Sequence, residues 1–82
     1  ESIFPADIMI TGEDQPGILS SISEVIAKDL KVSVRSISLD ADEGVFSGKI
    51  RLLVRDIKHL DFLISRLASL KGIYSVSRSE GI

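Results

Sequence analysis

The sequence predicts a two-layer α+β domain in which four antiparallel strands lie under two helices. The expected order is strand, helix, strand, strand, helix, strand. This order follows from segments of alternating apolar and polar residues, interrupted by two segments whose apolar residues recur at helical spacing. Each helical segment has a single apolar stripe, so both helices should cover the same face of the sheet. The 82 residues suffice for one modest core, and residues 1–82 are therefore expected to form a single domain.

The first strand and the first helix meet at the sequence GEDQPG, residues 12–17. The strand before it alternates, and its apolar face comprises Phe4, Ala6, Ile8 and Ile10. The helix after it has an apolar stripe that comprises Ile18, Leu19, Ile22, Val25 and Ile26. We expect Pro16 to occupy the first helical position and Asp14 to accept hydrogen bonds from the unpaired amides of the first turn.

The second and third strands are predicted to form a hairpin. In residues 32–40 the apolar positions change phase after Val34, and a β-bulge near Arg35–Ser36 would reconcile the two halves. The acidic residues 40–44 should form the turn, with Gly44 at positive φ. The third strand has the clearest alternation, and its inward residues are Phe46, Gly48, Ile50, Leu52 and Val54.

The second helix is expected to begin after Asp56, an N-cap residue, and to end at Gly72, where left-handed backbone is favoured. Its apolar stripe comprises Ile57, Leu60, Leu63, Ile64, Leu67 and Leu70. A short last strand follows, with Tyr74 and Val76 on one face. The complete order is that of a ferredoxin-like βαββαβ sandwich, with both helices on one face of a four-stranded antiparallel sheet.

The composition argues against several classes of function. The chain has no cysteine, which excludes disulfides and thiol chemistry, and its net charge of −2 gives no general attraction to nucleic acid. The single histidine, His59, has no partner pattern and is expected at the surface. The acidic residues Asp40, Asp42 and Glu43 lack the spacing of a cation-binding loop and are expected to form a solvated turn. We therefore predict no catalytic residue, no metal site and no cofactor.

Two kinds of binding site fit the residues. The outward sheet face gathers Lys49 and Arg51, with Arg35 and Arg78 nearby, and could contact phosphates. RNA-recognition modules of this topology stack bases on aromatic residues of the central strands. The outward positions here are Asp7, Met9, Thr11, Ser47, Lys49 and Arg51, none of them aromatic, so stacking-based RNA recognition is not expected.

The other candidate site is the corner at residues 12–17. A glycine turn followed by a helix start points backbone N–H groups outward, where a carboxylate or a phosphate can bind. Gly12 would allow the strand to turn, and Gly17 would leave space for a ligand. The same residues could equally make a tight corner without any ligand.

The sequence DQPGILSSISEVI resembles the D-x-P-G-L-L-x-x-I start of ACT domains, which are small regulatory modules of βαββαβ order. The resemblance extends through GVFSGKIRLLVRDIKHLDFLISRL to LKGIYSVSR and is to the C-terminal ACT domain of the RelA/SpoT family. Those enzymes make and hydrolyse guanosine tetraphosphate and pentaphosphate in the stringent response. Gln15 departs from the family, which usually has a basic residue there.

The resemblance implies a regulatory domain of a cytoplasmic (p)ppGpp synthetase or hydrolase, with the catalytic domains outside this sequence. The first residue is Glu1, which fits a C-terminal piece of a longer enzyme. The resemblance also implies a homodimer, contacts with other domains of the parent enzyme or through it with the ribosome, and an amino-acid ligand, branched-chain ones favoured. The implied ligand-binding residues are Gly12, Asp14, Gln15, Pro16, Gly17 and Ile18, with the carboxylate on the amides of the last two.

An alternative is a protein- or RNA-docking module with no small ligand. Phe62 is the residue that would support this alternative. Helical spacing places this aromatic residue opposite the apolar stripe of the second helix, among polar residues. Aromatic side chains are favoured as interface anchors. We therefore expect Phe62 to be exposed and to contact a second copy or another domain.

Overall fold

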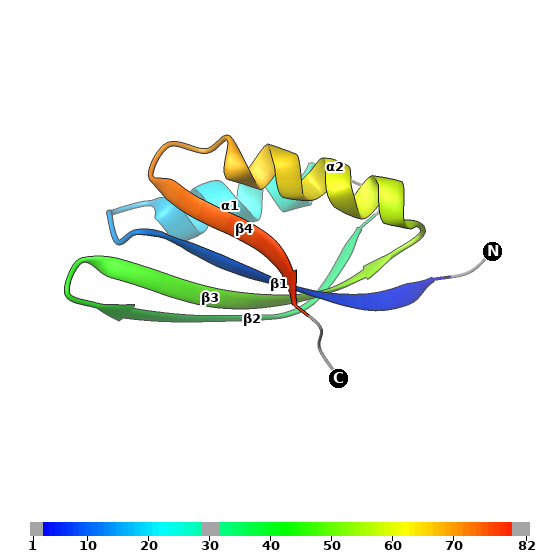
Figure 1. The fold of residues 1–82 in the computed structure, drawn as a ribbon, viewed down its shortest axis with the longest axis horizontal. Coiled ribbons are helices and arrows are strands. Elements are labelled where there is room, and N and C mark those ends of the chain that lie inside the picture. Colours follow the sequence, from blue (N-terminus) through cyan, green and yellow to red (C-terminus); the bar gives the residue numbers. More distant parts are fainter. Residues whose placement is uncertain (1–2, 29–31, 80–82) are drawn as a thin grey trace.

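The computed structural model describes residues 3–28 and 32–79 and confirms the predicted order of elements. Four strands form one antiparallel sheet of order β2-β3-β1-β4, and both helices lie on the same side of it (Figure 1). The two central strands are therefore β1 and β3, and the two edges are β2 and β4. The elements are β1 (Phe4–Glu13), α1 (Ile18–Ala27), β2 (Ser33–Asp42), β3 (Val45–Val54), α2 (Ile57–Ala68) and β4 (Ile73–Ser79).

The core lies between the sheet and the two helices. The central strands supply its sheet side, because their inward residues alternate with outward ones. All five inward residues predicted for β3 are buried. The buried apolar residues are Ile8 and Ile10 from β1, Ile18, Ile22 and Ile26 from α1, Phe46, Ile50, Leu52 and Val54 from β3, and Leu60, Leu63 and Leu67 from α2.

The β2–β3 hairpin has the predicted bulge and a shorter turn than predicted. The register shifts between Val34 and Ser36, which makes Arg35 the extra residue of a bulge. Pairing continues to Asp42 opposite Val45, so the turn consists of two residues only. These are Glu43 at φ 53° and Gly44 at φ 81°, and positive φ at both positions is what a type I′ turn requires.

Helix α2 begins as predicted. The carboxylate of Asp56 accepts a hydrogen bond from the backbone N–H of His59 at 2.7 Å, which caps the first turn. The helix ends at Ala68, earlier than predicted, with Ser69 as its C-cap. Gly72 has φ 91°, as expected, but it makes the turn into β4 instead of ending the helix.

Three side chains that were predicted on apolar faces are exposed. Leu19 is 47% exposed and Ile57 46%, so the buried stripe of each helix is narrower than the sequence indicates. Tyr74 is 63% exposed, because a bulge in β4 lies opposite Thr11 and Gly12 and separates Tyr74 from the face of Val76. His59, predicted at the surface, is half-buried.

Candidate functional site

The corner between β1 and α1 differs from the sequence prediction in how the helix begins. Helix α1 starts at Ile18, and its N-cap residue is Gly17 in left-handed conformation, with φ 83°. Pro16 therefore precedes the helix by two positions and does not occupy its first turn. Asp14 does not cap the helix either, because no side chain supplies a cap hydrogen bond. The left-handed conformation of Gly17 explains why neither Pro16 nor Asp14 has its predicted role. It turns the chain just before Ile18, so a helix that begins at Pro16 could not continue through it.

Backbone hydrogen bonds join this corner to two other loops. The N–H of Glu13 donates to the carbonyl of Gly72 at 2.7 Å, and the N–H of Asp14 donates to the carbonyl of Gly44 at 2.9 Å. The Gln15 side chain also donates to the carbonyl of Lys71, at 3.2 Å. The corner is thus held on one side by the β2–β3 turn and on the other by the loop between α2 and β4.

The six predicted site residues are brought together, but they differ in accessibility. Gly12 and Ile18 are buried, Gln15 is half-buried, and the exposed members are Asp14, Pro16 and Gly17. A Cβ atom on Gly12 would lie 2.6 Å from the carbonyl oxygen of Gly72, so the structure requires glycine there for packing. A Cβ atom on Gly17 would meet no heavy atom within 4 Å, so the space in front of it is open.

The two amides predicted to hold a ligand carboxylate are in different situations. The N–H of Ile18 donates to the carbonyl of Gln15 at 3.2 Å, so a ligand would have to replace that bond. In the part of the chain that the structure describes, the N–H of Gly17 has no such partner. Of the two backbone N–H groups, that of Gly17 is therefore the better placed to donate a hydrogen bond to a ligand carboxylate.

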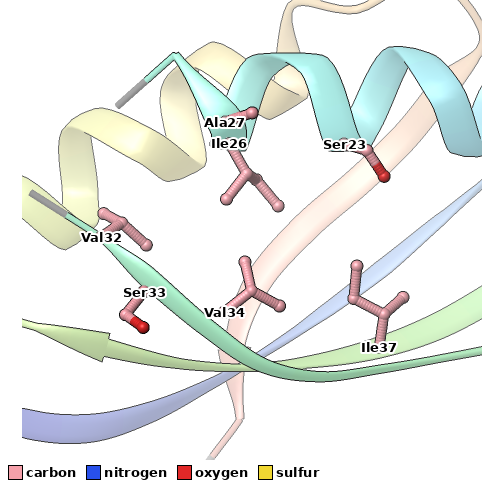
Figure 2. A pocket seen from close by; sticks show the side chains of 7 residues that line it. All are labelled: Ser23, Ile26, Ala27, Val32, Ser33, Val34 and Ile37. Carbon is pink, nitrogen blue, oxygen red and sulfur yellow. The ribbon is translucent and has the colours of Figure 1, made fainter. Parts of the chain in front are cut away.

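A second candidate feature is an apolar groove between α1 and the edge strand β2. Ile26 points down from the helix, and Val34 and Ile37 point toward it from the strand (Figure 2). The groove has a volume of about 460 Å³. Val34 is 38% exposed and Ile37 37%, so these aliphatic side chains contact water along it. Its complete lining comprises Ser23, Ile26, Ala27, Val32, Ser33, Val34 and Ile37. This groove could not be predicted from the sequence, because it depends on how far the helices extend over the sheet.

The outward sheet face carries fewer unpaired cations than the sequence indicates. Asp7 pairs with Arg51 across β1 and β3, and its two carboxylate oxygens accept hydrogen bonds from the Arg51 guanidinium at 2.8 and 3.1 Å. Lys49 approaches the same carboxylate at 4.0 Å. Arg78 lies opposite Ile8 and so belongs to the helix side of the sheet, which corrects its predicted place. The predicted outward positions of β1 and β3 are otherwise confirmed by the strand register.

The ion pair changes the acidity of Asp7. Hydrogen bonding from Arg51 holds the pKa of Asp7 below its ordinary value, helped by the charges of Arg51 and Lys49 and opposed by burial. The same hydrogen bond raises the pKa of Arg51. Sequence alternation placed both side chains outward, but the strand register was needed to show that they face each other.

We expect the contribution of Asp7 to the free energy of unfolding to depend on pH. Because its pKa is lower in the folded chain than in the unfolded one, ionised Asp7 favours folding. That contribution is complete above the ordinary carboxyl pKa of about 4 and is lost as the pH falls through the lowered native value. Urea unfolding of the wild type and Asp7→Asn from about pH 7 to about pH 2 measures it. The difference between them should shrink in acid, and a constant difference would contradict the expectation.

In residues 3–28 and 32–79, no group of three Asp, Glu or His side chains is arranged to hold a metal ion. Neither helix in this part of the chain has the length and apolar character needed to cross a membrane.

Nearly the whole chain is similar to known proteins. The sequence profile of a family described as "ACT domain" matches residues 1–78. The crystal structure of the ACT domain from GTP pyrophosphokinase of Chlorobium tepidum is 32% identical, with a TM-score of 0.86, and the match covers 95% of this chain and 100% of that one. The solution NMR structure of that domain gives 31% identity and a TM-score of 0.85, covering 98% and 90%.

A more distant structure shares the fold alone. The C-terminal domain of the MgtC protein from Mycobacterium tuberculosis is 18% identical, with a TM-score of 0.76, and the match covers 99% of this chain and 93% of that one. No curated protein sequence matches the chain.

Proposed function

The chain belongs to the ACT domain family, and from that premise we propose that it is the regulatory domain of a RelA/SpoT-like (p)ppGpp synthetase or hydrolase. The observation that carries the proposal is its 32% identity to the ACT domain of a GTP pyrophosphokinase over 95% of its length. The domain would sense an amino acid, or relay the nutrient or ribosome state, to catalytic domains outside this sequence. Nothing in the described residues supports catalysis by the domain itself.

The ligand site that we propose is the corner from Gly12 to Ile18. The N–H of Gly17 would receive the carboxylate of an amino acid, because the space in front of this residue is open. The positive end of the α1 dipole favours an anion at the same place. A branched aliphatic side chain would suit the exposed Leu19, one residue beyond the corner.

We also propose that two copies of the domain associate through β2. This strand is one edge of the sheet, and proteins normally cover or blunt such edges. The apolar groove beside it leaves Val34 and Ile37 partly exposed, so a second copy would bury apolar surface as well as pair the strand. A two-fold arrangement would make the contact closed and self-complementary.

A thermal-shift screen of the domain against the amino acids tests the sensor function. A ligand that binds only the folded state raises its stability, by about 2.7 kcal/mol at a hundred times the dissociation constant. We expect saturable stabilisation by the branched-chain class. The absence of a shift with every amino acid would favour the docking module over the sensor.

The variant Gly17→Asn tests whether a ligand-induced rise in melting temperature comes from binding at the corner. Asparagine tolerates the left-handed conformation better than other residues with a side chain, and its side chain would enter the open space where we place the carboxylate. The variant should therefore stay folded and lose most of the ligand-induced shift, with its unliganded melting temperature as the control for folding. A full shift in the variant would exclude this corner as the ligand site.

A further inference from the structure

The N–H of Gly17 belongs to a tight turn that begins at Gln15. The N–H of Ile18 donates to the carbonyl of Gln15 at 3.2 Å, which closes a four-residue turn over residues 15–18. Gly17 has φ 83° and ψ 0°, the values of the third residue of a type II β-turn, where glycine is favoured and proline commonly precedes it. Because Gln15 is the first residue of this turn, contacts that fix Gln15 also limit how the Gly17 N–H can move.

The Gln15 side chain contacts the loop between α2 and β4 and not the open space in front of Gly17. Its Nε2 donates to the carbonyl of Lys71 at 3.2 Å. The same Nε2 would lie 2.5 Å from a Cβ atom on Gly72, so the missing side chain of Gly72 leaves the space that the Gln15 amide fills. No side-chain atom of Gln15 lies within 4 Å of a Cβ position on Gly17. Gln15 is therefore placed to hold the turn and not to contact a ligand itself.

Further hydrogen bonds connect this loop to the end of α2. The carbonyl of Gly72 accepts from the N–H of Glu13 at 2.7 Å, so two successive carbonyls of the loop bind the corner. The N–H of Ile73 donates to the carbonyl of Leu70 at 3.2 Å. The N–H of Leu70 in turn donates at 3.1 Å to the carbonyl of Leu67, a buried residue of α2. Hydrogen bonds and short stretches of backbone thus join the turn at Gly17 to helix α2.

We propose that Gln15 is a positioning residue that couples the ligand corner to the α2–β4 loop, an inference that rests on the ligand site proposed above. The hydrogen bond from Gln15 to Lys71 holds the turn in place, so a carboxylate that binds the Gly17 N–H has less backbone freedom to remove. Coupling between two sites is reciprocal, so a bound carboxylate also restricts the α2–β4 loop. Occupancy of the corner thereby reaches α2, the helix at which this loop begins.

Amide hydrogen exchange without any ligand tests the positioning role. Gln15→Met has a side chain of similar length but no donor, so the Glu13 and Ile73 amides, whose partners lie in the α2–β4 loop, should exchange about threefold to tenfold faster. The Asp14 amide should keep its wild-type rate, because its partner is Gly44 in the β2–β3 turn. Gln15→Lys keeps a donor of sufficient reach and should restore most of the protection.

Calorimetric titration with L-valine tests the coupling. The dissociation constant should rise about threefold to tenfold in Gln15→Met and stay within about twofold of the wild type in Gln15→Lys. Saturating L-valine should slow exchange of the Glu13 and Ile73 amides in the wild type, and less so in Gln15→Met. A cooperative melting transition within about 5 °C of the wild type shows that each variant keeps the fold.

Three results would overturn the proposal. The first is an unchanged exchange rate of the Glu13 amide in Gln15→Met, and the second is an equal increase at Asp14, which would mean that the whole corner loosens. The third is an unchanged affinity for L-valine in Gln15→Met despite faster exchange in the loop. If L-valine does not bind the wild type, the proposed ligand site fails and the coupling fails with it. The exchange rates then still decide whether Gln15 holds the loop.

Discussion

Phe46→Ala is expected to lower the free energy of unfolding by about 3–5 kcal/mol, the range for a buried phenylalanine. The Phe46 side chain is 2% exposed and is the largest fully enclosed one in the core. It lies opposite Gly12 in the β1–β3 pairing, beneath the corner that we assign to the ligand. A cavity at this point would remove both core contacts and the support of the corner. Since small domains have only about 5–15 kcal/mol of stability, the variant should be close to unfolding.

Phe62→Ala provides the matched control for Phe46→Ala. The same side chain is deleted, but at a position that is 54% exposed. The free energy of unfolding should then fall by about 0.5 kcal/mol, as for ordinary surface substitutions. Urea unfolding of both variants gives the comparison. Equal losses would mean that the helix-side core is not where the structure places it.

Ile37→Glu is expected to convert the proposed dimer to a monomer at micromolar concentration. Ile37 faces the groove beside α1, opposite Ile50 in the β2–β3 pairing. A carboxylate there would be buried without a partner if a second copy covered the groove, which costs several kcal/mol. Sedimentation equilibrium over a range of concentrations measures the change in dissociation constant.

Ser38→Glu is the control for this variant. Ser38 is the next residue of β2 and lies opposite Lys49, so its side chain points to the other face of the sheet. The substitution Ser38→Glu therefore introduces the same charge into the same strand, but the new side chain does not enter the groove. We expect its self-association to match that of the wild type. A monomeric wild type at near-millimolar concentration would exclude the proposed dimer for the isolated domain.

Much of the fold could be predicted because the relevant signals are local in sequence. The inward residues of β3 follow from strict alternation, and the bulge at Arg35 follows from a phase change within one strand. The cap of α2 needs only Asp56 and the residues after it. Each of these features is decided by residues a few positions apart.

The features that were missed depend on contacts between distant segments. Tyr74 was misplaced because its bulge exists only in relation to β1. The ion pair of Asp7 and Arg51 could not be predicted without the register of β1 and β3, because the two residues are 44 positions apart. The start of α1 was missed for a different reason, because both a proline-started and a glycine-capped helix are compatible with the sequence DQPG. The residues of the predicted ligand site lie at one corner because they are nearly consecutive in the chain, but the hydrogen bonds from this corner to two other loops could not be predicted.

The position of β1 in the sheet has a consequence for how the chain folds. β1 lies between β3 and β4, and the hydroxyls of Thr11 and Ser75, 64 positions apart, are 2.8 Å from each other. One side of the first strand of this domain therefore stays unpaired until β4 has been synthesised. Pairing of such distant segments costs conformational entropy, because a long loop must close before the contacts between the strands form. Folding should therefore be slower than in a helical bundle of equal length. During that interval β1 presents an open edge on which other chains could add.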